Sequence, residues 1–199
     1  MAKQRMMLFF GSFNPVHRGH TALAEYAVEH NLCDAVAMII SPQNPFKQNQ
    51  SLAAEMDRFA MVEMACNNSR YPERIKASIV EFLLEKPSYT INTLRYLEQN
   101  NGHDMDFSIL MGSDLINTLP EWREAEAIIA DYDIYVYPRP EAELTFQTAR
   151  TTFLADAPQC EYSSTDVRRR LEAGQDVSHM LDRDVLKHIR ERGLWKKSL

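Results

Sequence analysis

The sequence predicts an α/β fold, in which a doubly wound, mostly parallel sheet carries helices on both faces and the C-terminal end is helical. The main observation is that short apolar runs, typical of buried parallel strands, alternate with segments of helical spacing. A second observation is that polar turns with glycine or proline follow several of these runs. The 199 residues contain no repeat and no evident linker, so we expect one domain over residues 1–199.

Strands and helices alternate through the first half of the chain. The continuous apolar run at residues 6–10 predicts a buried strand, and residues 21–29 have apolar positions at helical spacing. Residues 35–40 predict the next strand, and residues 51–67 predict a helix with a broad apolar face. A further strand-like segment lies within residues 75–84.

The second half continues this alternation to the C-terminal end. Residues 90–99 and 122–130 predict helices, and residues 107–111 and 134–137 predict strands. A last strand near residues 152–154 precedes two helices, at about residues 165–173 and 183–192. Ligands of open parallel sheets bind beyond the carboxyl ends of the strands. We therefore expect the segments that follow the strands to form one shared pocket.

Charge and cysteine content narrow the class of protein. The formal net charge is −6, which argues against a nucleic-acid partner, so the phosphates of a nucleotide would need a local cationic pocket. Cys33, Cys66 and Cys160 are far apart and lack C-x-x-C spacing, which argues against a disulfide framework or a zinc site. No apolar stretch approaches a secretory signal or the roughly 18 residues of a membrane span. We expect a cytoplasmic protein; the sequence leaves a homo-oligomer open.

The first turn, residues 11–20, carries the groups that an anion site needs. Gly11 permits close approach of the backbone to a ligand, and Gly19 leaves room for a bulky one. His17 and His20 are three residues apart, so at a helix start they share one face. There they can donate hydrogen bonds to phosphate, and protonation would strengthen that interaction. The alternative is a simple strand–turn–helix joint with two surface histidines. A metal site lacks a third ligand, and a G-x-G-x-x-G fingerprint is absent.

This turn resembles the ATP-binding signature of the nucleotidyltransferase superfamily, Gly-x-Phe-Asp/Asn-Pro-x-His-x-Gly-His, and matches it completely. The resemblance implies that His17 and His20 contact the ATP phosphates and stabilise charge on the transferred group. Ser12 stands where a second glycine is common. Asn14 replaces the commoner aspartate and is neutral, so it offers no charged metal ligand or base.

A second phosphate signature lies near the C-terminal end, at residues 162–168. Hydroxyl side chains at a helix start either cap the helix or bind phosphate, and Arg168, one turn into the helix, could reach the same anion. The segment resembles the superfamily signature Ile-Ser-Ser-Thr-x-x-Arg, with Tyr162 in place of isoleucine. The resemblance implies that Ser164, Thr165 and Arg168 hold the β- and γ-phosphates.

The middle of the chain resembles the bacterial nicotinate-nucleotide adenylyltransferase family. The matching segments are Ser-Tyr-Thr at residues 88–90, Gly-x-Asp at 112–114, Leu-x-x-Trp at 119–122 and Arg-Pro at 139–140. Residues 44–47 read Asn-Pro-Phe-Lys where that family has Pro-Pro-His-Lys. The resemblance implies a Rossmann-like fold and adenylyl transfer from ATP to nicotinate mononucleotide in NAD biosynthesis, with Mg²⁺ accompanying ATP.

The site residues follow from these resemblances. The expected ATP-binding residues are Gly11, Ser12, Phe13, His17, His20, Gly112, Asp114, Ser164, Thr165 and Arg168, of which His17, His20 and Arg168 are the catalytic candidates. The expected residues for the pyridine nucleotide are Asn14, Lys47, Tyr89, Thr90, Trp122 and Arg139. Backbone donors near Tyr89 or Trp122 are the candidates for the nicotinate carboxylate, since no lysine or arginine is evident there. No protein metal ligand is expected.

Several alternatives remain open at this point. Tyr89 and Trp122 could be core or interface aromatics, Thr90 a helix cap, Asp114 a turn residue and Lys47 a solvent-exposed lysine. A nicotinamide-mononucleotide or dual-specificity adenylyltransferase would fit the same motifs. A nucleotide-binding regulatory protein without turnover is a further alternative, against which the intact His17, His20 and Arg168 argue.

Overall fold

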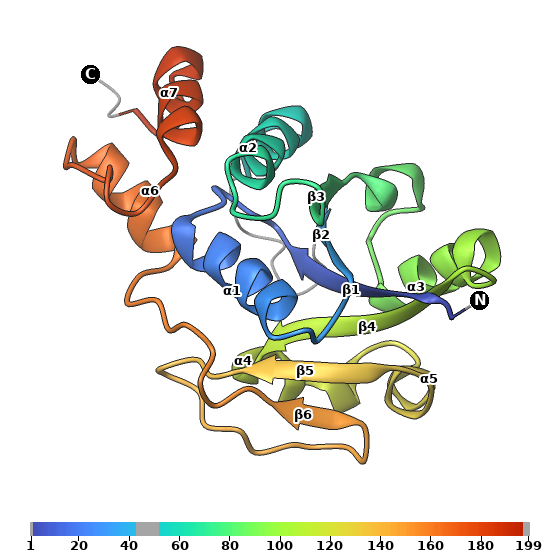
Figure 1. Ribbon diagram of the computed structural model, residues 1–199. Coiled ribbons are helices and arrows are strands. Elements are labelled where there is room, and N and C mark those ends of the chain that lie inside the picture. Colours follow the sequence, from blue (N-terminus) through green and yellow to red (C-terminus); the bar gives the residue numbers. More distant parts are fainter. Residues whose placement is uncertain (1, 43–51, 197–199) are drawn as a thin grey trace.

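The sheet has six parallel strands in the order β3-β2-β1-β4-β5-β6, as seen in a computed structural model that describes residues 2–42 and 52–196 (Figure 1). The strands are β1 (Gln4–Gly11), β2 (Ala35–Ile40), β3 (Ile75–Ser78), β4 (Met105–Gly112), β5 (Asp133–Tyr137) and β6 (Thr151–Phe153). This order reverses between β1 and β4, so the predicted doubly wound α/β fold is confirmed, and the sheet is parallel throughout its described strands.

Helices connect these strands. They are α1 (Arg18–Glu29), α2 (Glu55–Asn67), α3 (Thr90–Asn101), α4 (Ser113–Ile116), α5 (Ala125–Asp131), α6 (Ser164–Glu172) and α7 (Arg183–Arg192), with 3₁₀ turns η2 (Val80–Leu83) and η3 (Leu119–Glu121). No helix in the described ranges is long and apolar enough to cross a membrane.

Three predicted helix starts differ from the structure by three or more residues. The helix expected from residue 51 begins at Glu55, because residues 52–54 are not helical. The helix expected from residue 122 begins at Ala125, because Trp122 is extended and Glu124 has a left-handed backbone with φ 52°. The first helix begins at Arg18, three residues earlier than predicted, with His17 as its N-cap. The earlier start of α1 matters for the site, because it puts His17 and His20 on the same first turn.

Alternate residues of the central strand enter two separate cores. Met7 and Phe9 pack on one face of the sheet with residues of α1, α2 and α7. Leu8 points to the other face, into a core that includes residues of α3 and α5. Burial of both faces explains why β1 reads as a continuous apolar run rather than an alternating one.

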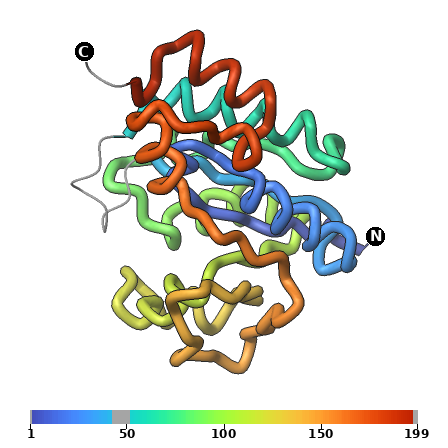
Figure 2. The backbone as a smooth tube through the Cα atoms, turned by 90° about the vertical axis from the view of Figure 1, so that its left-hand side faces the viewer, coloured from blue at the N-terminus to red at the C-terminus, as the bar shows by residue number. Residues whose placement is uncertain are grey.

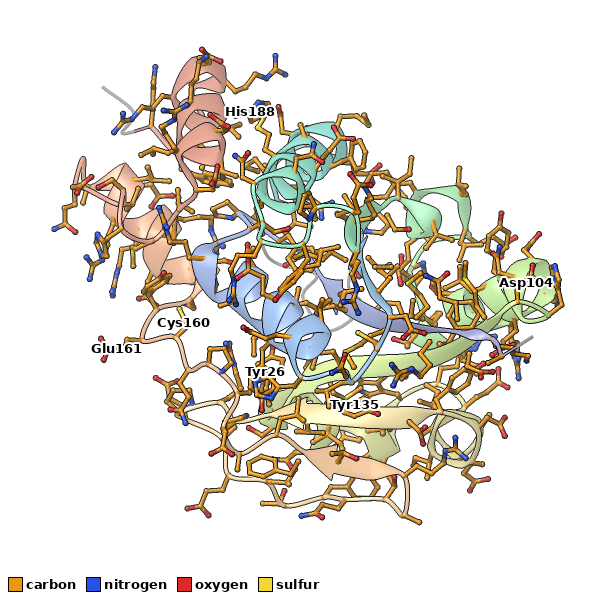
Figure 3. The ribbon with its side chains drawn as sticks, viewed as in Figure 1. Tyr26, Asp104, Tyr135, Cys160, Glu161 and His188 are labelled. Carbon is orange, nitrogen blue, oxygen red and sulfur yellow. The ribbon has the colours of Figure 1, made fainter. Side chains whose placement is uncertain are left out.

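The C-terminal helices return to the first half of the chain. After β6 an extended segment, orange in Figure 2, leads from the edge of the sheet back to α1, where α6 begins. Helix α7 then lies beside α2, where the Asp57 carboxylate lies 3.0 Å from Nε2 of His188 and accepts from Nε of Arg192 at 2.9 Å. Figure 3 labels His188 on α7. The return of the chain to α1 places the second signature next to the first.

Candidate active site

A cavity of about 910 Å³ lies at the carboxyl ends of the strands. Its wall includes Gly11 at the end of β1, Ser41 after β2, Asp114 after β4, and Tyr137 and Arg139 at and after β5. The cavity therefore sits where the strand order reverses, which is the expected place for a ligand in this kind of sheet.

The cavity wall brings together most of the residues that the sequence predicted for the site. Those that line it are Gly11, Ser12, Phe13, His17, His20, Tyr89, Thr90, Asp114, Trp122, Arg139, Ser164, Thr165 and Arg168. Lys47 lies outside the described residues. Asn14 and Gly112 are described but are not part of the wall.

Asn14 and Gly112 contact residues around the cavity without lining it. Asn14 is fully buried, and its Oδ1 accepts the Ala53 amide at 3.0 Å. A Cβ atom on Gly112 would stand 2.3 Å from Oδ1 of Asp114 and 2.9 Å from Cγ of Arg139. Gly112 thus leaves room for two lining side chains. A direct contact of Asn14 or Gly112 with a ligand stays a prediction.

His20 is held by its neighbours in a defined orientation. Its Nδ1 accepts the backbone N–H of His17 at 3.2 Å, so in the neutral ring the proton lies on Nε2. The His17 ring lies 3.8 Å away between centroids, tilted by 31°, and the Phe13 ring meets His20 edge-on at 5.1 Å. A Cβ atom on Gly11 would approach the Phe13 ring to 2.8 Å, so Gly11 makes this arrangement of rings possible.

His17 is a buried, neutral imidazole. It is 5% exposed, and its Nδ1 has no hydrogen-bond partner in the described structure. Burial, with the nearby positive charge of Arg139, lowers the pKa of His17 to about 4. At neutral pH His17 therefore acts as a hydrogen-bonding group without charge, and the expected gain from its protonation is absent in the unliganded protein.

This pKa predicts a pH dependence of stability that belongs to His17. A histidine whose pKa falls from 6.5 to about 4 on folding contributes stability that is complete above about pH 6.5 and is lost as the pH falls towards 4. Between pH 7 and 5 the free energy of unfolding should fall by about 2 kcal/mol more in the wild type than in His17→Asn, which cannot titrate. Urea unfolding at both pH values measures this difference. Equal changes in the two proteins would contradict the lowered pKa.

The room beside Gly19 is taken by protein. A Cβ atom on Gly19 would stand 2.7 Å from Cβ and 2.8 Å from Sγ of Cys160, which Figure 3 labels in the segment that leads to α6. The expectation that Gly19 leaves room for a ligand was therefore wrong. Gly19 instead lets the segment before α6 pack against the start of α1.

The two phosphate signatures touch each other directly. Arg168 donates from Nη1 to the Asn14 carbonyl at 2.7 Å, and the Ser164 hydroxyl donates to the Pro15 carbonyl at 2.8 Å. Ser163 caps α6: its Oγ accepts the backbone N–H of Asp166 at 3.3 Å, and its own N–H donates to the Asp166 carboxylate at 2.9 Å. The hydroxyl of Ser164 is thus engaged with the first turn, which leaves the N–H groups at the start of α6 as candidate phosphate donors.

Helices α1, α3 and α6 all begin at this cavity. Its wall includes His17 and His20 at the start of α1, Tyr89 and Thr90 at the start of α3, and Ser164 at the start of α6. Helix N-termini carry partial positive charge and N–H groups without intrahelical acceptors. This convergence explains how a chain of net charge −6 can offer a local site for anions.

Arg58 is a site residue that the sequence analysis missed. Its side chain is fully buried and donates to the carbonyls of Ser12 at 2.8 Å and Ser41 at 2.7 Å, and also to those of Pro42 and Ala53. Arg58 thus fixes the turns that follow β1 and β2. The available signal was its position, because Arg58 is spaced at i, i+3 and i+4 with buried Met61 and Val62 on α2, in the middle of an apolar face.

Glu81 and Ser88 add buried polar atoms to the wall. Glu81 is 2% exposed, its Oε1 accepts from Oγ1 of Thr93 at 3.0 Å, and burial raises the pKa of this carboxyl group. Oε2 of Glu81, Oγ of Ser88 and Nδ1 of His17 are the buried side-chain atoms that lack a hydrogen-bond partner within the described ranges. All three residues line this cavity. Since such atoms usually have partners, the cavity is suited to a polar ligand.

Comparison with known proteins agrees with this geometry. Residues 8–170 match the model of the cytidylyltransferase-like family. A protein of Bacteroides fragilis named "probable nicotinate-nucleotide adenylyltransferase" is 39% identical over 190 residues, which cover 95% of this chain and 92% of that one. A protein of the same name from Cytophaga hutchinsonii is 38% identical over 186 residues, covering 93% and 95%.

A solved structure supports the fold. The nicotinic acid mononucleotide adenylyltransferase of Plasmodium falciparum, complexed with NaAD, superposes with a TM-score of 0.79 at 16% identity, over 96% of this chain and 97% of that one. At this identity the likeness bears on the fold alone, and it agrees with the Rossmann-like sheet. The chain belongs to the cytidylyltransferase-like family and is a near full-length relative of bacterial proteins named as probable nicotinate-nucleotide adenylyltransferases.

Proposed function

We propose that this protein transfers the adenylyl group of ATP to nicotinate mononucleotide, which gives deamido-NAD and pyrophosphate. The observation that carries the proposal is the meeting of both phosphate signatures on one cavity, where Arg168 donates to the backbone of the first turn. Its curated relatives, which match over nearly their whole length, support the same activity.

The chemistry of this transfer requires positioning more than proton transfer. The nucleophile is a phosphate oxygen of the mononucleotide, and a phosphate monoester with a second pKa near 6 is already largely dianionic at neutral pH. This oxygen attacks the α-phosphorus of ATP, and pyrophosphate leaves. The protein has to bring two anions together and stabilise the charge on the α-phosphate and the leaving group, so fixed donors are the important groups.

We assign the triphosphate to the start of α1 and α6. His20 donates from Nε2 to the α-phosphate, since its Nδ1 is occupied by the His17 amide. His17 supplies a neutral hydrogen-bonding group beside it. Arg168, Thr165 and the first-turn N–H groups of α6 hold the β- and γ-phosphates, because the Ser164 hydroxyl already donates to Pro15.

The remaining lining residues divide between the two nucleotides. By family resemblance, Gly112 and Asp114 lie on the adenosine side, and Tyr89, Thr90 and Trp122 surround the pyridine ring. The Arg139 side chain lies 3.8 Å from Asp114, and its positive charge helps to lower the pKa of His17. We therefore place Arg139 between the adenosine and the pyridine nucleotide. Lys47 remains our candidate for the incoming phosphate.

Mg²⁺ enters this account with ATP as part of the substrate. Within the described ranges there is no cluster of three His, Cys, Asp or Glu side chains that could hold a metal ion. Mg²⁺ commonly keeps several waters and binds proteins through substrate phosphates. The hydroxyl, imidazole and N–H groups of this wall suit the phosphates of Mg-ATP, so the ion would enter bound to ATP.

We propose that the whole chain acts as one domain in the cytoplasm.

Removal of Trp122 tests the placement of the pyridine ring. Trp122 lines the cavity and donates from Nε1 to Oγ1 of Thr118 at 3.2 Å, which fixes the indole. Trp122→Ala should raise KM for nicotinate mononucleotide by about 3-fold to 10-fold, since an aromatic contact is worth about 0.5–1.5 kcal/mol. KM for ATP should stay near the wild-type value, and Trp122→Phe should restore most of the loss. An unchanged pyridine KM in steady-state kinetics would make Trp122 a packing residue.

The reaction itself is tested by leaving out substrates. Pyrophosphate release should require both Mg-ATP and nicotinate mononucleotide, and should proceed with a higher kcat/KM than with nicotinamide mononucleotide. Comparable values for the two would favour the dual-specificity alternative. ATP binding without release on either mononucleotide would favour the non-catalytic regulatory protein.

A further inference from the structure

An arginine lies where the sequence analysis expected none. The Arg123 guanidinium carbon lies 4.9 Å from the centre of the Tyr89 ring, a cation–π arrangement between two residues of the cavity wall. Trp122 is its neighbour in the chain and lines the same cavity. Arg123 therefore belongs to the aromatic corner of the wall that we assign to the pyridine ring.

Among the described residues, the Arg123 guanidinium makes no hydrogen bond and only a weak ion pair, while Arg139 on the same wall lies 3.8 Å from Asp114. Arg168 is engaged by the Asn14 carbonyl and by Oγ1 of Thr165. The ion-pair partner of Arg123 in the described structure is Glu124, at 4.0 Å. That carboxylate already accepts two hydrogen bonds from Arg95. Arg123 thus keeps donors for a ligand.

The planar guanidinium matches one feature that distinguishes the two mononucleotides. Nicotinate carries a carboxylate, which accepts two parallel hydrogen bonds from a guanidinium, whereas the carboxamide of nicotinamide accepts with one oxygen and presents an NH₂ group. Stacking on Tyr89 restricts the orientation of the guanidinium. The exposed acidic side chain of Glu121 belongs to the same wall, so a carboxylate ligand there needs a cation.

We propose that Arg123, stacked on Tyr89, binds the pyridine carboxylate and is a specificity-determining residue for nicotinate over nicotinamide. This inference rests on the proposed function. It adds a side-chain cation to the backbone donors that we expected from the sequence. The same side chain could instead bind the phosphate of the mononucleotide. The experiment distinguishes binding of the carboxylate from binding of the phosphate.

The test compares kcat/KM for nicotinate and nicotinamide mononucleotide at saturating Mg-ATP. Arg123→Gln should lower kcat/KM for the nicotinate substrate by about 10-fold to 100-fold, mainly through KM, since a hydrogen bond to a charged group is worth about 1.5–3 kcal/mol. The value for the nicotinamide substrate should change less than about 3-fold. Arg123→Lys should fall between, because it keeps the charge and loses the planar fork.

Arg150→Gln is the matched control. Arg150 is a partly exposed arginine that pairs with Asp133 at 3.1 Å and does not line the cavity, so its removal should leave the selectivity ratio unchanged. An equal loss on both mononucleotides for Arg123→Gln would assign Arg123 to the phosphate and overturn the proposal, as would unchanged kcat/KM values for both substrates. Failure of the proposed function is distinct, because the wild type would then be inactive on both substrates.

Discussion

His20→Ala should lower kcat by about 10²-fold to 10³-fold, as expected when one donor to a developing oxyanion is removed. In the structure, the His17 amide fixes Nδ1 of His20, and the rings of His17 and Phe13 fix the plane of the imidazole. The Nε2 donor is therefore oriented before ATP arrives, and orientation in advance is what makes such a donor effective in the transition state. ATP affinity should fall much less than kcat.

His20→Gln and a substitution of His30 provide the controls for this prediction. His20→Gln can place an amide N–H near the position of Nε2, so it should recover part of the rate that His20→Ala loses. His30 is exposed and stacks on Tyr26 at 4.0 Å, and its replacement by alanine should leave the rate unchanged. Steady-state kinetics and ATP titration of each variant give both quantities. Equal losses in ATP affinity and in kcat/KM would instead identify His20 as a group that binds ATP in the ground state.

Arg58→Met should lower the free energy of unfolding by about 3 kcal/mol or more. The substitution keeps an unbranched apolar chain in the buried space but leaves the Ser12 and Ser41 carbonyls, among others, without their donor. Each buried acceptor left unpaired costs about 1–3 kcal/mol, and the energy regained by no longer burying a guanidinium offsets part of that sum. Urea unfolding followed by circular dichroism measures the change.

Arg70→Met is the control for this change. Arg70 donates to Glu25 and Glu29, but its side chain is more than half exposed, so water replaces the lost partners and the effect should be much smaller. A similar, small effect of both substitutions would show that Arg58 does not hold the turns after β1 and β2. Because Ser12 belongs to the cavity wall, Arg58→Met should also raise KM for ATP in the fraction that remains folded.

The fold could be predicted where local pattern and burial agree. Strand β2 and helix α7 have the predicted limits, and β1 and β4 extend the predicted apolar runs by one or two residues at each end. The segment before α5 could not be predicted, because its break depends on the left-handed backbone of Glu124, a residue type that ordinarily favours helix. The 3₁₀ turn η2 was likewise missed, since four residues carry too little periodicity.

The site could be predicted where its residues are neighbours in sequence. The first turn and the start of α6 form continuous motifs, and both lie on the cavity as expected. Arg58 and Glu81 act through contacts with distant segments, which a sequence motif does not record. The pKa of His17 depends on its burial and on Arg139 from the end of β5, so it follows only from the folded structure.

The central claim is that adenylyl transfer to nicotinate mononucleotide takes place in this cavity. The most direct test is to quantify deamido-NAD by mass spectrometry after incubation of Mg-ATP and nicotinate mononucleotide with the wild type and, in parallel, with folded His20→Ala. We predict one deamido-NAD for each pyrophosphate with the wild type, and formation slower by at least about 10²-fold with the variant. Absence of product with the folded wild type, or equal rates for the two proteins, would contradict this account.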